Sequence, residues 1–153
     1  MPPLETVFSF ATFIAMFGWI LLVVVPADPR ARLLTAIIIP LTLSAIYLAY
    51  IFLHIGTAPG GFGSLAEVKL LFGTDELLLA GWIHYLAFDL FIGAWESRDS
   101  QRLGIPRLVM VPCYLMTFML GPIGLLFYFA IRTAKTRSLS LSRRSLGEGG
   151  DAV

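Results

Sequence analysis

The chain has 153 residues, of which 58% are hydrophobic and 14% are charged, and its mean hydropathy is +0.83. Soluble domains carry about a quarter charged residues, so this composition predicts an integral membrane protein. The formal net charge is only +1 and the basic residues form no long run, which excludes a surface built to bind a nucleic-acid backbone. The composition favours lipid and apolar ligands as partners.

Four apolar runs are each close to the length of about 20 residues that a helix needs to cross the hydrocarbon core of a bilayer. They cover Leu4–Val25, Arg30–Ile55, Leu77–Trp95 and Arg107–Ile131. A transmembrane barrel would instead show short segments of alternating polarity, and backbone groups in lipid must be satisfied within a helix. The sequence therefore predicts an all-α, four-helix transmembrane bundle, formed as one domain by residues 1–131.

Local signals mark where these helices begin and bend. Asp28, with the proline after it, is typical of a helix start, and Thr74 precedes two acidic residues that suit the first turn of the third helix. Pro40 predicts a kink in the second helix. In the fourth helix, Pro112 and the cluster Gly121–Gly124 predict another kink, because each proline removes a backbone hydrogen bond.

The connection Gly56–Gly73 is the longest loop and is rich in glycine. Within it, Ser64 followed by Glu67 is a capping box, which predicts a short helix that ends near Gly73. Such a helix would lie on the membrane surface or over the mouth of the bundle. We expect this connection to be structural rather than a functional lid, and no phosphate-loop motif follows its glycines.

From Arg132 onward the chain is polar and has no apolar period to bury, so residues 132–153 are predicted to form a disordered tail. The first apolar run lacks the basic region of a secretory signal and is interpreted as a retained helix. In a four-span topology the basic residues divide almost evenly between the two sides, so their distribution does not decide the orientation. The single cysteine, Cys113, is interpreted as a packing residue.

The third predicted helix carries ionisable residues inside an apolar run. A carboxylate near the bilayer midplane is costly unless it is neutral, paired or hydrated, which makes such a residue a functional candidate. At 100° per residue, Tyr85, Asp89 and Glu96 share one face, whereas His84 lies about 140° from Asp89. This separation disfavours a metal ion bound by both. We predict no metal site, although the sequence leaves open whether His54, His84 or Glu96 binds a metal. It does not determine whether a cofactor is used.

Two interpretations of His84 and Asp89 remain open. In one, they form hydrogen bonds between helices that set the register of the bundle. In the other, they are catalytic groups that transfer protons or polarise a substrate in an apolar cavity. Six further residues are predicted to bind that substrate. They are Trp82, Tyr85, Phe88, Glu96, Thr42 and Thr117.

Depth along the helices predicts the neighbours of the buried carboxylate. At about 1.5 Å per residue, Asp89 is level with Trp19, Thr42 and Thr117, which are therefore its predicted partners. Glu96 lies toward the end of the same run. Its alternative interpretation is a helix-end residue whose carboxylate reaches the lipid headgroups.

The segment Trp82–Phe91, W-I-H-Y-L-A-F-D-L-F, and the segment Gly121–Leu126, G-P-I-G-L-L, resemble the ABA4-like family. This is a small family of four-helix membrane proteins that includes the plant neoxanthin-formation factor of the plastid. The resemblance covers residues 5–131. It implies a carotenoid isomerase of the neoxanthin-synthase type, in which the epoxide of violaxanthin opens and rearranges without net redox change. It also implies acid and base roles for His84 and Asp89, which match the family motif.

The chain departs from the plant relatives because it has no Arg- and Ser-rich leader and carries W-E-S-R-D at Trp95–Asp99. We therefore expect a protein of the bacterial inner membrane that acts on a carotenoid or a related polyene or isoprenoid lipid. One alternative is a non-catalytic protein that binds carotenoid or lipid, or helps another membrane enzyme. Another is a small transporter or channel, which would require a homo-oligomer because four spans leave little room for alternating access.

Overall fold

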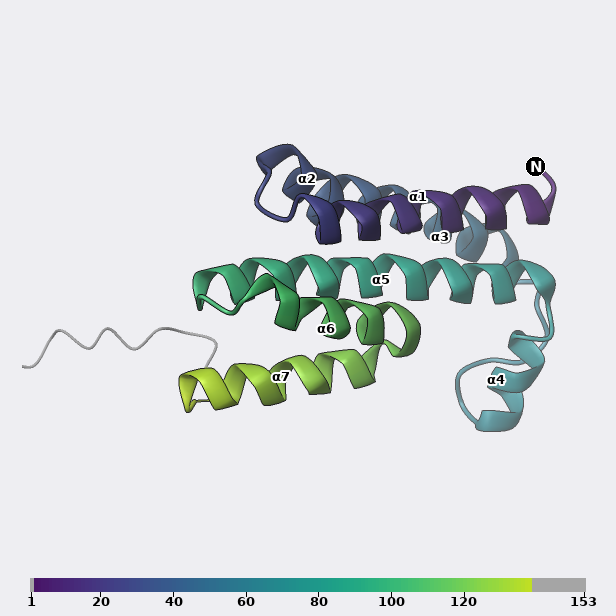
Figure 1. Ribbon diagram of the computed structural model, residues 1–153. Coiled ribbons are helices and arrows are strands. Elements are labelled where there is room, and N and C mark those ends of the chain that lie inside the picture. The colour runs from purple at the N-terminus through teal and green to yellow at the C-terminus, as the bar shows by residue number, and fades with distance from the viewer. Residues whose placement is uncertain (1, 139–153) are drawn as a thin grey trace, which may run out of the picture.

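The computed structural model describes residues 2–138, in which every regular element is a helix (Figure 1). The elements are α1 (Leu4–Val24), α2 (Pro29–Leu33), the π-helical turn η1 (Leu34–Ile38), α3 (Ile39–His54), α4 (Leu65–Leu71), α5 (Asp75–Arg102), α6 (Arg107–Leu120) and α7 (Pro122–Thr136). Because α2, η1 and α3 follow one another without a break, they form one long helix. The described part therefore contains six helices rather than the predicted four.

Three of these helices are long and apolar enough to cross a membrane: α1, the long helix Pro29–His54, and α5. They suggest insertion into a membrane, as the composition predicts. By contrast, α6 is apolar but has only 14 residues. At 1.5 Å per residue it is about 21 Å long, which is shorter than the hydrocarbon core of about 30 Å.

The predicted capping residues occupy the starts of their helices. Asp28 Oδ1 accepts two first-turn backbone N–H groups at 2.9 Å each. Ser64 Oγ accepts the N–H of Glu67 at 3.2 Å, while Glu67 Oε2 accepts the N–H of Gly63 at 3.0 Å, which confirms a helix capped at Ser64. Thr74 stands at the N-cap position of α5, but its side chain makes no capping hydrogen bond.

The irregularity predicted for the second helix is a widened turn just before Pro40. Proline has no backbone N–H and its ring crowds the preceding turn, so an α-helical hydrogen bond cannot form there. The chain relaxes into the π-helical turn η1, and regular α-helix resumes as α3.

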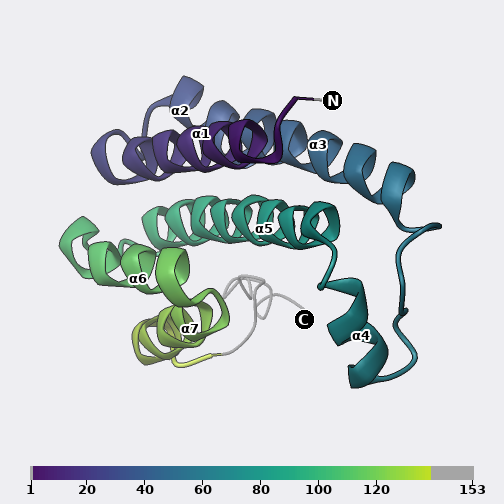
Figure 2. The same ribbon diagram turned by 90° about the vertical axis from the view of Figure 1, so that its right-hand side faces the viewer.

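The prediction of a fourth transmembrane helix, Arg107–Ile131, is wrong. Gly121 has a φ of +46°, ends α6 and serves as the N-cap of α7, so the chain reverses instead of continuing across the bilayer. A side chain is strained at positive φ, whereas glycine is not. The two short helices pack as a hairpin beside α5 (Figure 2). Pro112 lies inside α6, and the break is at Gly121 instead.

Only the first residues of the predicted polar tail, 132–138, lie in the described part of the structure. The helix α7 continues to Thr136, and Arg132 is buried within the protein. Residues 139–153 of the predicted tail lie outside the described residues.

The hairpin places the end of α7 at the same end of the molecule as the C-terminal ends of α1 and α5 (Figure 1). We call this the basic end. Arg107 at the start of α6 donates to the carbonyl oxygens of Val23 and Val24, the latter at 2.7 Å, which ties α6 to the end of α1. Eight of the nine described Lys and Arg residues belong to segments at this end. They are Arg30, Arg32, Arg98, Arg102, Arg107, Arg132, Lys135 and Arg137.

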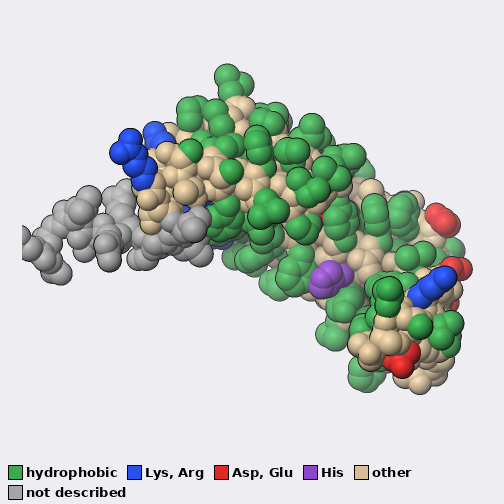
Figure 3. All heavy atoms as spheres, turned by 90° about the horizontal axis from the view of Figure 1, so that it is seen from below, with side chains coloured by type: hydrophobic (Ala, Val, Ile, Leu, Met, Phe, Trp, Pro, Cys, Tyr) green, Lys and Arg blue, Asp and Glu red, His purple; other side chains and the backbone are tan. Residues whose placement is uncertain are grey.

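The remaining described cation, Lys69, lies on α4 at the opposite end, where Glu5, Glu67 and Asp75 also lie. The face in Figure 3 shows the same separation of basic from acidic side chains along the molecule. Short segments rich in Lys and Arg stay on the cytoplasmic side of a membrane or its topological equivalent. The basic end is therefore expected to face that side, an orientation that a four-span topology could not decide.

This topology predicts the sides from which single cysteines react. In a four-span bundle, residues 57 and 134 would share a side. With the hairpin, Ala134→Cys should instead react from the same side as Ala27→Cys, and Thr57→Cys from the other, when oriented membranes are treated with an impermeant maleimide. The unsubstituted protein is the control, because its only cysteine, Cys113, is buried. Labelling of Ala134→Cys from the side that labels Thr57→Cys would contradict the hairpin.

Candidate functional site

One face of α5 directs four polar side chains toward the hairpin of α6 and α7. We call Tyr85, Asp89, Glu96 and Asp99 the acidic face of α5. The prediction that the first three share a face is confirmed, because each meets the hairpin. At the end of this face nearest the start of α5, the Tyr85 hydroxyl donates to the carbonyl oxygen of Phe118 on α6 at 2.5 Å.

Asp89 lies against the turn between α6 and α7. A Cβ atom at Gly121 would stand 3.1 and 3.2 Å from the two carboxyl oxygens of Asp89. This is the N-terminal end of α7, where backbone N–H groups lack partners in their own helix and the helix dipole favours negative charge. The Tyr85 hydroxyl, which donates to Phe118, lies near this carboxyl group on the same face of α5. Within residues 2–138, Asp89 Oδ2 is buried and has no hydrogen-bond partner.

Glu96 is fully buried, with 0% of its surface exposed. The hydroxyl of Thr117 on α6 lies 3.1 Å from each of its carboxyl oxygens and donates to the carboxyl group. The alternative that Glu96 reaches the headgroups is wrong, because its face of α5 is covered by α6. The helices of the hairpin also meet here, since a Cβ atom at Gly124 would overlap the backbone of Thr117. Two predicted substrate-binding residues, Glu96 and Thr117, are therefore brought together inside the protein.

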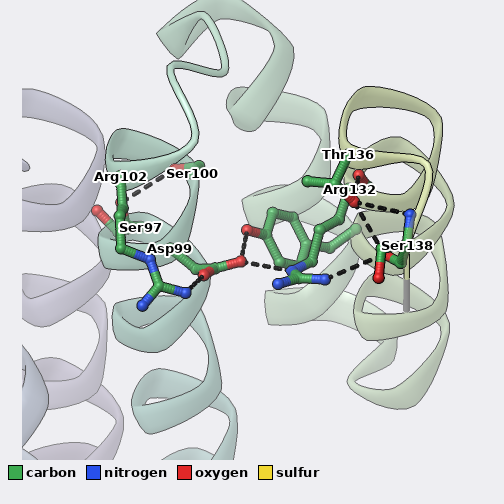
Figure 4. A network of polar contacts seen from close by, with 8 residues as sticks. Ser97, Asp99, Ser100, Arg102, Arg132, Thr136 and Ser138 are labelled. Atoms are coloured by element: carbon green, nitrogen blue, oxygen red, sulfur yellow. Dashed lines mark hydrogen bonds and ion pairs between the residues drawn. The ribbon is translucent and has the colours of Figure 1, made fainter. Parts of the chain in front are cut away.

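Asp99 binds the end of α7 (Figure 4). Its Oδ2 accepts from Tyr128 Oη at 2.8 Å and from Arg132 Nε at 2.7 Å. Its Oδ1 accepts from Arg102 Nη2 at 2.7 Å. Arg132 is only 2% exposed, so this is a buried ion pair.

Sequence reasoning missed this ion pair because Arg132 was assigned to the polar tail and Asp99 to the loop after the third helix. One signal could have found it. Tyr128 and Arg132 are four residues apart, which places a phenol and a guanidinium on one face of a helix that continues past Ile131.

A second feature lies where α1, α4 and α5 meet, toward the end opposite the basic end. There a cleft of about 570 Å³, which we call the aromatic cleft, is lined mostly by apolar and aromatic side chains. Its lining residues are Leu4, Glu5, Phe8, Phe72, Asp75, Leu78, Leu79, Gly81, Trp82 and Tyr85. Trp82 packs 5.6 Å from the ring of Phe8, and its Nε1 donates to Thr12 Oγ1 at 3.3 Å. Tyr85 belongs to both features and so connects the aromatic cleft to Asp89.

His84 lies on a different flank of α5 from Asp89. It is exposed and stacks on Phe88 with ring centroids 4.5 Å apart, and Tyr47 on α3 lies 5.5 Å from it. Phe88 is itself 56% exposed. The structure therefore does not bring the two predicted catalytic residues into one site, in keeping with their separation on the helical wheel.

Of the three predicted partners, none is recorded as hydrogen-bonded to Asp89 within residues 2–138. Thr42 is exposed, donates to the carbonyl oxygen of Ile38 in its own helix at 2.8 Å, and lines a groove between α1 and α3. Trp19 packs against Phe118 with ring centroids 5.7 Å apart. Thr117 binds Glu96 instead, because the α6 register places it about two turns along α5 from Asp89.

The residues considered as metal ligands have separate surroundings. His54 stacks on Tyr50, His84 stacks on Phe88, and Glu96 is held by Thr117. The described residues contain no group of three or more His, Cys, Asp or Glu side chains placed to hold one metal ion.

The ion pair at the end of α7 predicts a large loss of stability when one partner is neutralised. Arg132→Gln should lower the free energy of unfolding by about 3–5 kcal/mol, because it leaves a buried carboxylate without its main counter-charge. Lys135→Gln, an exposed neighbour on the same helix, should change it by less than about 0.5 kcal/mol. Chemical unfolding in detergent measures both variants. Equal stabilities would contradict a structural role for the pair.

The turn at Gly121 offers a second stability test. Gly121→Ala should cost more than the roughly 1–2 kcal/mol of a residue in the left-handed helical region. Its φ of +46° and ψ of −99° lie outside that region, and its methyl group would meet Asp89. Gly104→Ala measures the cost of a positive φ in open space, since Gly104 has a φ of +64° and no neighbour within 4 Å of a Cβ. Gly56→Ala, in open space, is the near-neutral control. If Gly121→Ala is no more harmful than Gly104→Ala, Asp89 does not lie against the turn.

Comparison with known proteins gives one finding. Residues 6–128 match the model of a family described as ABA DEFICIENT 4-like. No curated protein and no solved structure matches the chain. The matched region includes the acidic face of α5 and the Gly121 turn, and it ends just before Arg132. Because this match covers most of the sequence, the chain belongs to the ABA4-like family.

Proposed function

We propose that this ABA4-like protein binds a carotenoid, or a related polyene or isoprenoid lipid, in the aromatic cleft and isomerises it by proton transfer at Tyr85 and Asp89. The observation that carries the proposal is the position of Tyr85. Its ring lines the cleft, and its hydroxyl lies near Asp89 on the same face of α5. Asp89 holds a buried carboxyl oxygen without a partner in the described residues. A buried acceptor without a partner costs about 1–3 kcal/mol, so this arrangement favours function over packing.

The lining of the aromatic cleft suits a conjugated hydrocarbon. Phe8, Phe72, Trp82 and Tyr85 present aromatic rings, and the volume of about 570 Å³ lies within the usual range of about 300–1,000 Å³ for small-molecule sites. Aromatic rings pack well against the faces of other π systems. Any part of a carotenoid that extends beyond the cleft would lie along the exposed apolar surface of α1.

The proposed chemistry needs no oxidant or reductant. When an epoxide isomerises to an unsaturated alcohol, a C–O bond breaks and the oxygen gains a proton, while a C–H bond breaks and its electron pair forms a new double bond. One proton is gained and one is lost. Tyr85 would donate to the oxygen and Asp89 would accept the proton from carbon, and transfer from Asp89 to Tyr85 would restore both groups.

In the proposed mechanism, the second proton-transfer group beside Asp89 is Tyr85 rather than His84. The family resemblance implies His84 as the second proton-transfer group, whereas the geometry favours Tyr85. His84 is exposed on another flank of α5, and its ring packs against Phe88 and Tyr47 rather than against the aromatic cleft.

A second candidate is a non-catalytic protein that binds carotenoid or lipid, or supports another membrane enzyme. The observation that favours it is the structural use of the other two carboxylates. Glu96 and Asp99 both bind the hairpin, as expected of polar residues that set the register of membrane helices. Asp89 could serve the same purpose at the turn.

Substitutions distinguish these functions. Asp89→Asn and Tyr85→Phe should each lower the rate of isomerisation at least about 100-fold, while His84→Ala should stay close to the unsubstituted protein. Purified protein in nanodiscs would be incubated with epoxy-carotenoids, and products separated by chromatography and identified by their absorption spectra. Thr42→Val, in a different groove, is the matched control.

Folding is checked by the thermal midpoint of each variant. Full turnover by folded Asp89→Asn would remove Asp89 from the mechanism. Loss of turnover in His84→Ala with normal rates in Tyr85→Phe would assign the site to the flank of α5 that carries His84. If the unsubstituted protein retains the carotenoid but converts none, the binding function is supported instead.

A further inference from the structure

One flank of α5, separate from Asp89 and Glu96, carries side chains at alternating intervals of three and four residues. Among them, Trp95 packs against Tyr128 and Phe129 of α7, with ring centroids 5.4 and 5.7 Å apart. The side chains of this flank change from apolar to basic toward the basic end of the molecule. We call them the outer stripe of α5: Phe88, Phe91, Trp95, Arg98 and Arg102. At 100° per residue they fall within about 80° of one another, on a different side from Asp89 and Glu96. Trp95 is half-buried and the other four are exposed.

The basic part of the outer stripe borders a small cleft. Its volume is about 240 Å³. Trp95, Arg98, Asp99 and Arg102 line it. The charge of Asp99 is already compensated by the buried guanidinium of Arg132 and by Arg102, so the cleft as a whole is positive. Within residues 2–138 Arg98 is exposed and forms no hydrogen bond or ion pair.

The apolar part of the outer stripe borders a second hollow. Its volume is about 370 Å³, and it lies between the long second helix and α5. Phe88 and Phe91 form its wall on α5, while Pro40 and Leu41 belong to the opposite wall beside the widened turn η1. Phe91 is four residues from Trp95, about 6 Å along the helix. The apolar hollow and the basic cleft therefore follow one another along a single flank of the protein.

We propose that the outer stripe of α5 is a binding site for one anionic phospholipid. The phosphate lies between Arg98 and Arg102, the indole of Trp95 lies at the level of the glycerol, and an acyl chain fills the hollow beside Phe88 and Phe91. Guanidinium groups bind phosphate oxygens in a planar, two-bonded geometry, and tryptophan prefers the boundary between headgroups and hydrocarbon. Basic pockets between membrane helices are suited to anionic headgroups.

The apolar hollow favours a lipid over a soluble phosphate compound. A free phosphate would use only the arginines and leave Phe88 and Phe91 unused. The stripe also runs along a helix that is long and apolar enough to cross a membrane, and its basic residues lie in the last two turns of that helix. The headgroup and acyl chain of a bilayer lipid would meet the basic and apolar residues in this order. The site is separate from the aromatic cleft, and the inference does not depend on the proposed isomerase activity.

Native mass spectrometry of the full chain in detergent, titrated with phosphatidylglycerol or phosphatidylcholine, tests this site. Phosphatidylglycerol should bind with one-to-one stoichiometry and more tightly than phosphatidylcholine. Arg98→Gln should weaken phosphatidylglycerol about fivefold, and Arg98→Gln with Arg102→Gln about 30-fold, at about 1 kcal/mol for each charge. Lys69→Gln, an exposed cation on α4 at the opposite end, is the matched control and should have no effect.

Arg102 also binds Asp99, so the double variant can disturb the hairpin, whereas Arg98→Gln removes a group with no recorded partner in the described residues. A thermal midpoint accompanies each measurement. The proposal is overturned if Arg98→Gln binds phosphatidylglycerol as the unsubstituted protein does, or if the two lipids bind equally. It is also overturned if inorganic phosphate competes as strongly as phosphatidylglycerol, because the ligand would then be a soluble anion. Phe91→Ser should weaken long-chain phosphatidylglycerol more than its dihexanoyl analogue.

Discussion

The buried ion pair between Asp99 and Arg132 decides the architecture of the second half of this protein. It joins the last turns of α5 to the last turns of α7, and Tyr128 adds a hydrogen bond to the same carboxylate oxygen. A guanidinium that is 2% exposed must be paired, because removing a charge from water without a partner is costly. Since Arg132 is paired at the basic end, α7 must return to that end.

The hairpin meets α5 at three places along one face. Asp89 lies at the turn, Glu96 binds Thr117 in the middle, and Asp99 binds Arg132 at the end. These contacts use three carboxylates that would otherwise face lipid, which accounts for their presence in an apolar helix. The three carboxylates differ in whether all of their buried oxygens have hydrogen-bond partners. Glu96 and Asp99 have polar partners, whereas Asp89 keeps a buried oxygen without one in the described residues and lies beside Tyr85 of the aromatic cleft.

Much of this architecture could be predicted from the sequence. Run length and hydropathy identify α1, the long second helix and α5, because a continuous apolar run of this length is governed by the thickness of the bilayer. Capping chemistry is local, so Asp28 and Ser64 could be assigned from their immediate neighbours. The 100° rotation per residue placed Tyr85, Asp89 and Glu96 on one face for the same reason.

The hairpin could not be predicted in this way. Hydropathy does not distinguish one long apolar helix from two short ones, and the glycine and proline at the turn are also compatible with a kink. Whether a buried Glu96 faces protein or headgroups depends on which helix covers it, and that information is not local. Arg132 was assigned to a solvated tail because its partner, Asp99, is 33 residues away in the chain.

The most direct measurement is the distance between the C-terminal ends of α5 and α7 in a bilayer. Spin labels at Arg98→Cys and Ala134→Cys, with Cys113 replaced by alanine, can be measured by pulsed electron paramagnetic resonance. Because Asp99 and Arg132 are in contact, the separation should be well below the hydrocarbon thickness of about 30 Å. A separation of about 30 Å or more would show that the last helical segment crosses the membrane, and it would contradict the hairpin and the site built on it.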